Sequence, residues 1–255
     1  MKRQALRWIV TGSLLASSQL AAQPLNDLQA RLAALRHDQQ VRVTVDVDLK
    51  HRGSAPLHLS ATKRKGRAIV EYGPRGVKMI DQRWSGVSTR FSIWRRAKGE
   101  TVIPLLDDVE AGELVDPAGM IGLLLSEAEL VSDEKVSFQG LPARLLVLRP
   151  FQRAADPGAA GAGDPKPLTV EAKLWLDESG APIAMERSLE LRLAPALAVT
   201  ERQDLTFQQV AGRLLVDEAR ETYAGTGLAV LRGKDDKTLK VTAVRAVATA
   251  AAPGG

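Results

Sequence analysis

The stretch that most constrains the fold is Val41–Lys50, in which apolar and polar residues alternate without a break. Side chains of a β-strand point alternately to its two faces, so this stretch predicts a strand with one dry and one wet face. Ten residues at about 3.3 Å each give a strand of roughly 33 Å, which is longer than usual. Similar one-sided patterns recur along the chain with short connections, which favours antiparallel neighbours.

These patterns together predict a mainly β protein with a few helices, in which a single curved antiparallel sheet (an incomplete barrel) is covered by helices. About a dozen strands are expected, at 41–50, 57–63, 67–72, 77–84, 87–95, 134–139, 143–149, 168–177, 182–193, 205–210, 213–223, 228–232 and 238–247. Turns are expected at His51–Pro56, Lys63–Gly66 and Gly73–Gly76, where glycine, proline and basic residues gather.

Two segments predict helices that cover the sheet. Leucines recur at helical spacing in Pro24–Arg36, which is typical of an amphipathic helix. Pro104–Pro117 reads as acidic and irregular, but Asp116 and Pro117 then supply an N-cap and a first-turn proline for a helix over Ala118–Leu130. This second helix is apolar and softened by two glycines, so it is a candidate lid; the alternative is an ordinary core-covering helix.

One charged residue breaks the strand pattern. Arg187 lies on the apolar side of the strand Pro182–Leu193. A buried arginine without a partner is costly, so Arg187 is expected either near an end of the strand or against an internal acceptor.

The first 22 residues are typical of a signal peptide. A basic start with Lys2, Arg3 and Arg7 precedes the short apolar stretch Trp8–Leu20, and cleavage is expected after Ala22. A membrane anchor is the alternative, but the stretch is shorter and more polar than a span of about 20 apolar residues. The mature chain is expected to form one domain over 23–248, with a flexible loop at 150–167 and a disordered tail at 249–255.

The chain contains no cysteine, so it has no lipobox, disulfide framework or thiolate metal site. Together with the signal peptide, this predicts a soluble, non-lipidated protein of the bacterial periplasm.

Charge is divided unevenly along the chain. Residues 41–100 hold 14 basic and 5 acidic residues, whereas residues 101–148 hold 2 basic and 9 acidic residues. One interpretation is that solvated faces and hairpin tips attract each other. The other is that the basic half meets an anionic partner, such as lipid headgroups or an acidic protein surface. Nucleic acid is not expected as a partner, because the sequence has no recognition motif.

No catalytic or metal motif is present. The sequence lacks HExxH, paired-histidine, EF-hand and GxSxG patterns, and the acidic run 107–113 lacks the spacing of a calcium loop. His37, His51 and His58 are expected at the surface. We therefore expect no enzyme activity, no cofactor and no metal.

A signal peptide, an amphipathic helix, a long one-sided meander and a mid-chain apolar helix follow in that order. With Trp175–Pro182 (WLDESGAP) and Thr206–Leu214 (TFQQVAGRL), this arrangement resembles the periplasmic lipoprotein-carrier superfamily, which includes LolA-like and LolB-like proteins and the amino-terminal domain of RseB. The resemblance implies an incomplete barrel whose helices cover an apolar cavity for acyl chains, and a role in outer-membrane lipoprotein sorting and transport. In these carriers an arginine tethers the lid to neighbouring backbone groups, and the resemblance assigns that role to no residue here.

Two hypotheses of function follow. The leading one is a non-enzymatic periplasmic protein that binds a lipid, a lipoprotein or a similar amphiphile through its acyl chains in an apolar cavity. The expected lining consists of inward-facing strand and helix residues, for which plain core packing is the alternative: Val45, Val47, Leu59, Met79, Phe91, Ile93, Ile121, Leu124 and Leu125. The second is an envelope interaction or sensing protein with a filled core, which uses the basic 41–100 face or exposed Trp84 and Trp94 against a protein partner.

Overall fold

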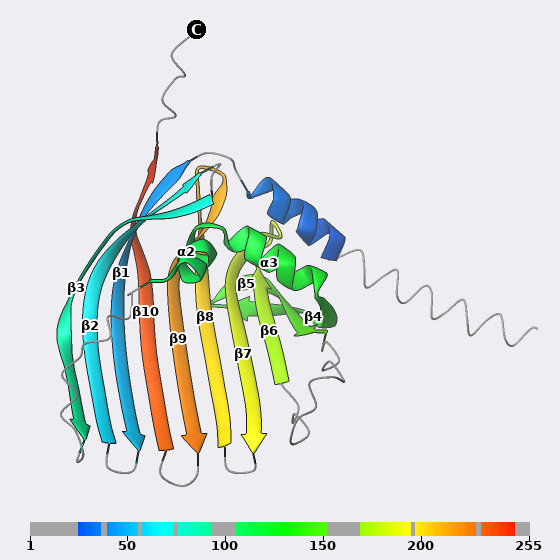
Figure 1. The fold of residues 1–255 in the computed structure, drawn as a ribbon. Coiled ribbons are helices and arrows are strands. Elements are labelled where there is room, and N and C mark those ends of the chain that lie inside the picture. The colour runs from blue at the N-terminus through cyan, green and yellow to red at the C-terminus, as the bar shows by residue number, and fades with distance from the viewer. Residues whose placement is uncertain are drawn as a thin grey trace, which may run out of the picture.

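The computed structural model describes residues 25–36, 40–55, 58–73, 76–92, 106–151, 169–194, 197–227 and 231–247. Ten strands within these ranges form one sheet in the order β3-β2-β1-β10-β9-β8-β7-β6-β5-β4. Every neighbouring pair is antiparallel, and the sheet is not closed into a barrel (Figure 1). The predicted fold class, a single antiparallel sheet covered by helices, is therefore confirmed.

The strands are β1 (Val41–Ala55), β2 (His58–Gly73), β3 (Gly76–Ser92), β4 (Ala128–Phe138), β5 (Leu141–Pro150), β6 (Thr169–Leu176), β7 (Pro182–Ala194), β8 (Leu197–Val210), β9 (Arg213–Gly227) and β10 (Leu231–Ala246). The helices are an N-terminal helix over 25–34, α2 (Asp108–Val115) and α3 (Pro117–Ser126).

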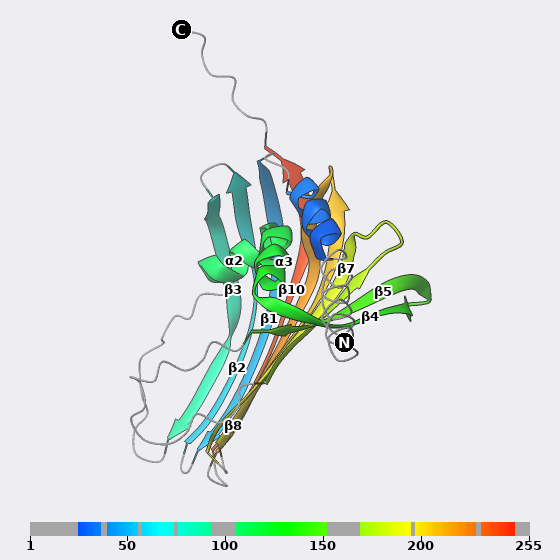
Figure 2. The ribbon, with the colours of Figure 1, turned by 90° about the vertical axis from the view of Figure 1, so that its right-hand side faces the viewer.

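The first and last strands, β1 and β10, are neighbours inside the sheet. β1 pairs with β2 on one side and with β10 on the other, whereas β3 and β4 form the two edges. The passage from β3 to β4 must therefore cross the whole sheet, and α2 and α3 lie on that passage. These helices and the N-terminal helix cover one face of the sheet, which we call the inner face; the opposite face is the outer face (Figures 1 and 2).

The core lies between the inner face and the three helices. Val41, Val43, Val45 and Val47 of β1 are all buried, which matches the alternation that predicted this strand. They join one apolar cluster with Leu28, Leu32 and Leu35 of the N-terminal segment and with buried residues of α2 and α3. Burial of a valine or leucine side chain contributes about 1.5–3 kcal/mol of gross transfer free energy, so this layer is the main source of stability.

Several predicted turns are wrong, because the strands run through them. β1 continues through 51–55, and β2 replaces two predicted strands and the turn between them. Gly66, expected in a turn, pairs with Val47 on one side and Trp84 on the other. A ladder with long strands on both sides satisfies the backbone of 63–66, so local turn chemistry is overridden. The paired predictions 77–84 with 87–95, and 228–232 with 238–247, likewise merge into β3 and β10.

Other boundaries also differ from the prediction. Residues 108–115, expected to be irregular, form α2 behind a capping box of Asp107 and Glu110. The predicted helix over 118–130 starts as expected, with Asp116 as N-cap and Pro117 in its first turn, but it ends at Ser126. β4 then starts at Ala128 and β8 at Leu197, which is earlier than predicted in both cases.

The predicted signal peptide at 1–22 and the predicted tail at 249–255 lie outside the described residues. Of the predicted loop at 150–167, the structure describes only Pro150 and Phe151. Among the described residues, no helix is long and apolar enough to cross a membrane.

Gly86 offers a test of the continuous β2–β3 ladder. A Cβ atom at Gly86 would lie 2.2 Å from the Lys63 carbonyl oxygen and 2.8 Å from the Arg64 Cα. Gly86→Ala is therefore expected to lower the free energy of unfolding in urea by about 1–3 kcal/mol through overpacking. Gly233→Ala in β10 is the control, since its Cβ would meet no atom within 4 Å; it should be neutral or stabilise by up to about 1 kcal/mol. Equal stability of the two variants would contradict this packing.

Candidate functional site

The predicted lining residues that the structure describes lie in one layer. Val45, Val47, Ile121 and Leu125 are buried in the central cluster, and Met79 and Leu124 pack against it half-buried. Leu59 and Phe91 belong to β2 and β3, but their side chains are outside the described set, and Ile93 lies outside the described residues altogether. The sheet and α3 thus share these residues, and their role in binding stays a prediction.

The helices α2 and α3 form a short segment over the inner face, Asp107–Ser126, which we call the lid segment. Asp107 accepts a hydrogen bond from Glu110 N at 2.8 Å, and Glu110 accepts one from Asp107 N at 2.9 Å, which fixes the start of α2. Asp116 ends α2 and begins α3, where its carboxylate accepts a hydrogen bond from Gly119 N at 3.1 Å. The segment is therefore locally ordered at both of its helix starts.

Polar side chains from separate elements hold the lid segment in place. Arg36, just after the N-terminal helix, binds Asp116 with Nη2 at 2.7 Å from Oδ2. Lys237 of β10 pairs with Glu110. On the approach to the segment, Gln82 of β3 donates a hydrogen bond to the Leu106 carbonyl at 2.9 Å. The lid segment is thus fixed by directional contacts as well as by apolar packing.

Arg187 is one of these contacts, which resolves the exception in the strand pattern. Its Nη2 lies 3.5 Å from Glu113 Oε1 of α2. Gln203 of β8 donates to the other oxygen of Glu113 at 3.2 Å. The prediction of an internal acceptor for Arg187 is therefore confirmed.

Arg213 makes the most buried of the polar contacts with the lid segment. Its side chain donates to the carbonyl oxygen of Val115 from Nε at 3.2 Å and from Nη2 at 3.0 Å. The guanidinium also lies over the Tyr72 ring, 3.9 Å from its centroid. Only 2% of Arg213 is exposed, so its charge is removed from water and held by these neighbours.

Sequence reasoning missed Arg213, although it lies inside the quoted TFQQVAGRL stretch. The two-residue loop Ala211-Gly212 joins β8 to β9, and both residues adopt positive φ angles of 51° and 78°. This tight hairpin places Arg213 at the first position of β9, and the next residue, Leu214, donates its backbone N–H to the Leu35 carbonyl. An arginine directly after a hairpin turn, before the apolar run Leu214–Val216, is the signal that could have identified it.

A row of polar residues crosses the inner face beneath α2. Gln203 donates to Glu221 of β9 at 2.9 Å as well as to Glu113, and the pair Lys237–Glu110 lies beside them. Burial raises the pKa of Glu221, with nearby Glu110 and Glu113 adding to the shift, while the Gln203 hydrogen bond and Lys237 oppose it. The row separates the apolar layer under the lid segment from the more distant part of the inner face, where Tyr223 is exposed.

The remaining polar features do not assemble a metal site among the described residues. His51, expected at the surface, is half-exposed and contacts Asp235 of β10. His37 and the side chain of His58 lie outside the described set. Trp84, expected to be exposed, is instead half-buried, and the Arg64 guanidinium lies 4.6 Å from its ring centroid. Trp94 is also outside the described residues.

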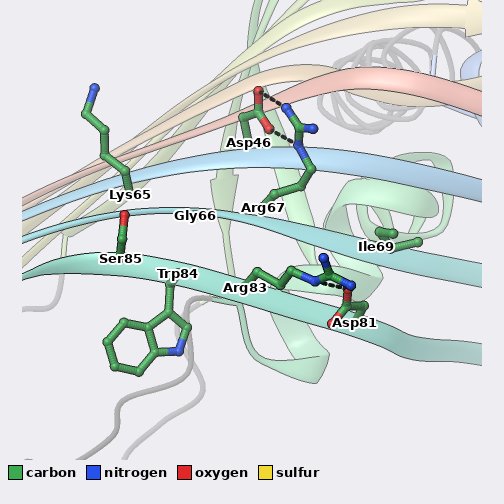
Figure 3. A pocket seen from close by; sticks show the side chains of 9 residues that line it. All are labelled: Asp46, Lys65, Gly66, Arg67, Ile69, Asp81, Arg83, Trp84 and Ser85. Atoms are coloured by element: carbon green, nitrogen blue, oxygen red, sulfur yellow. Dashed lines mark hydrogen bonds and ion pairs between the residues drawn. The ribbon is translucent and has the colours of Figure 1, made fainter.

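A depression of about 650 Å³ lies on the sheet at β1, β2 and β3. Its lining is mainly charged and includes Asp46, Arg67, Asp81 and Arg83. Figure 3 shows Arg67 against Asp46 and Arg83 against Asp81, with Trp84 pointing away from Lys65. This depression differs from the apolar cavity that the resemblance implies, because the ion pairs Arg67–Asp46 and Arg83–Asp81 line it.

No family model matches the sequence, and a search of curated proteins finds no match. Two solved structures are similar to the chain. One is of lipovitellin, from a study of its lipid–protein interactions, with a TM-score of 0.41 and 8% identity over 85% of this chain. The chain spans only 26% of that lipovitellin chain. The other is a DUF1329 family protein from Desulfovibrio piger, with a TM-score of 0.40 and 12% identity over 91% of this chain and 95% of that one. Both similarities are weak, so function is argued from the geometry of the chain itself.

Loss of the hydrogen bonds from Arg213 to the Val115 carbonyl is expected to lower the stability of the protein strongly. Arg213→Met should lower the free energy of unfolding in urea by about 2–4 kcal/mol, because the buried Val115 carbonyl loses a charged donor. The control is Arg220→Met, whose side chain is 63% exposed and pairs with Glu218; it should change stability by no more than about 0.5 kcal/mol. Similar losses of unfolding free energy in both variants would show that the Arg213–Val115 contact stabilises the fold no more than an exposed ion pair does.

Glu221 predicts a pH-dependent stability. Because the pKa of Glu221 is raised in the folded state, protonation of Glu221 stabilises that state. This contribution to the free energy of unfolding is complete below the ordinary pKa of 4.5 and is lost as the pH rises through the raised pKa. Glu221→Gln keeps an acceptor for Gln203 but cannot ionise. The free energy of unfolding of this variant should therefore exceed that of the parent by an amount that grows from pH 4 to pH 8. Glu218→Gln on the same strand is the control, because it removes the pair with Arg220. A gain that does not change with pH would contradict a raised pKa at Glu221.

Proposed function

We propose that this protein is a non-enzymatic periplasmic carrier that binds the acyl chains of a lipid, a lipoprotein or a similar amphiphile. The chains would lie between the apolar inner face and the lid segment, in a half-barrel that the lid segment closes. One observation carries the proposal: the cover of the open sheet's apolar face includes two short helices, α2 and α3, which separate polar contacts hold in place.

The lid segment must move for this function. Val45 and Ile121 have no exposed surface, so a ligand reaches them only when α3 leaves the sheet. Opening breaks the contacts at Asp116, Glu113 and Val115, and water can solvate each of these groups once it is exposed. Opening also exposes apolar sheet, which acyl chains would cover again. On opening, water therefore satisfies the polar groups of the lid contacts, and the bound acyl chains take the place of the lost apolar packing.

The composition of α3 favours such movement. It has ten residues, and helices this short are marginal without tertiary contacts. A Cβ atom at Gly122 would meet no atom within 4 Å, so close packing does not require glycine there. A glycine in a helix costs up to about 1 kcal/mol relative to alanine, which keeps α3 easy to displace.

The burial of the core residues beneath the helices also supports a second function. The described core residues are closed off from solvent, which also fits an envelope interaction or sensing protein with a filled core. That protein would bind a protein partner through its surface, and Trp84, stacked under Arg64, is less suited to this than the sequence suggested.

Uptake of an acyl probe distinguishes the two functions. A chain that begins at Gln23 keeps every described residue and omits the predicted signal peptide. We expect it to bind dansyl-undecanoic acid, and Arg213→Met to bind it more tightly, because a weaker lid contact raises the population of the open state. Arg220→Met should bind as the parent does.

A label reports whether the lid segment moves. The chain has no cysteine, so Leu123→Cys on α3 and Leu141→Cys at the β4–β5 turn, both exposed in the parent, can each carry one environment-sensitive dye. The probe should change the signal at position 123 and leave position 141 unchanged. Absence of probe uptake, together with no amphiphile in native mass spectra of protein purified from the periplasm, would reject the carrier and leave the interaction protein.

A further inference from the structure

The outer face of β3, β2, β1 and β10 carries like charges directly opposite one another. The ladder register places cations from adjacent strands side by side at four positions, and all eight residues are exposed: Arg42 with Arg245, Arg52 with Lys234, Lys50 with Lys63, and Arg67 with Arg83. Like charges directly opposite in a sheet are destabilising, so this arrangement lowers the stability of the folded chain.

Acidic neighbours compensate only part of this charge. Among the described residues, four of the eight cations form ion pairs: Arg42 with Glu71, Arg67 with Asp46, Arg83 with Asp81 and Lys234 with Asp236. Asp236 also lies opposite Lys50 in the ladder with β10. Within the described parts of the chain, Lys50 and Lys63 form no ion pair. The acidic residues of α2 do not neutralise them either, since Glu110 and Glu113 pair with Lys237 and Arg187 across the inner face. The excess positive charge of this outer face is therefore open to a partner.

We propose that this basic face, the outer side of β3, β2, β1 and β10 centred on Lys50 and Lys63, docks on a bilayer surface that bears anionic headgroups. Neighbouring strands are about 4.8 Å apart, so cations from four strands form a broad array rather than a pocket for one anion. A lipid surface offers negative charge over a comparable area. The depression at Arg67 and Arg83 belongs to the same face, but its cations are already paired and it is not a separate site.

An exposed apolar residue next to the cations favours a bilayer over an acidic protein. Val87 of the edge strand β3 pairs in register with Lys63 and is 70% exposed. Lysine beside an exposed aliphatic side chain suits the headgroup region, where the charge meets phosphate and the side chain enters the interface. The basic face is separated from the inner face by the sheet itself, so docking does not depend on acyl-chain binding.

Sedimentation with vesicles tests the proposal. The chain from Gln23 onward is mixed with vesicles of phosphatidylcholine alone, or of phosphatidylcholine and phosphatidylglycerol in equal parts. We expect partitioning only to the anionic vesicles, and weaker partitioning as salt is raised. Lys50→Gln with Lys63→Gln should weaken it roughly 25-fold, since each basic residue near an anionic surface contributes about fivefold.

The matched control removes two charges elsewhere. Arg31→Gln with Lys135→Gln changes the net charge equally, and both residues are exposed outside the basic face; it should weaken partitioning less than about threefold relative to the parent. The Lys50/Lys63 variant should melt close to the parent, because it removes the repulsion between Lys50 and Lys63 together with the attraction between Lys50 and Asp236 opposite it in β10. Equal binding to both vesicle types, equal loss in the control, or no vesicle binding would overturn the proposal, and the last result would direct attention to an acidic protein surface. Absence of acyl-probe uptake would contradict the proposed carrier function but would not contradict docking of the basic face on a bilayer.

Discussion

The rest of the structure depends on one constraint: an open sheet with an apolar face needs a cover. Closing the strands into a barrel would hide that face within the sheet, but here β3 and β4 remain as edges at opposite ends of the strand order. The N-terminal helix supplies part of that cover, and the connection between those edges supplies the rest with two short helices. The cover therefore combines apolar packing by Ile121 and Leu125 with polar contacts at Asp116, Glu113 and Val115, each made to a different part of the fold.

Local features of the sequence predicted the elements whose causes are local. The alternation in Val41–Lys50 predicted both β1 and its buried face, and Asp116-Pro117 predicted the start of α3. The same reasoning placed a turn at Lys63–Gly66, because glycine and charge are typical of turns. The actual state of that stretch depends on β1 and β3 lying on both sides of it, and pairing across a sheet is not visible in a local window.

The candidate site divides in the same way. The parity of each strand predicted that Val45 and Val47 face inward, where the structure buries them, and it marked Arg187 as needing a partner. Parity did not reveal Arg213, because its acceptor, the Val115 carbonyl, lies 98 residues away in the sequence and is a backbone group without a residue type to signal it. Contacts to backbone atoms from distant elements are the part of a site that a single sequence conceals most completely.

The two faces of β1 now have different physical roles. Val43, Val45 and Val47 point inward and provide the packing that makes the sheet stable. Arg42, Lys50 and Arg52 point outward and meet other cations in the neighbouring strands, which packing does not require and stability disfavours. A strand whose inner residues stabilise the fold can tolerate such repulsion on its outer face. Because side chains alternate at each residue, the proposed acyl-binding layer and the proposed membrane-docking layer can share the same strands while substitutions on one leave the other in place.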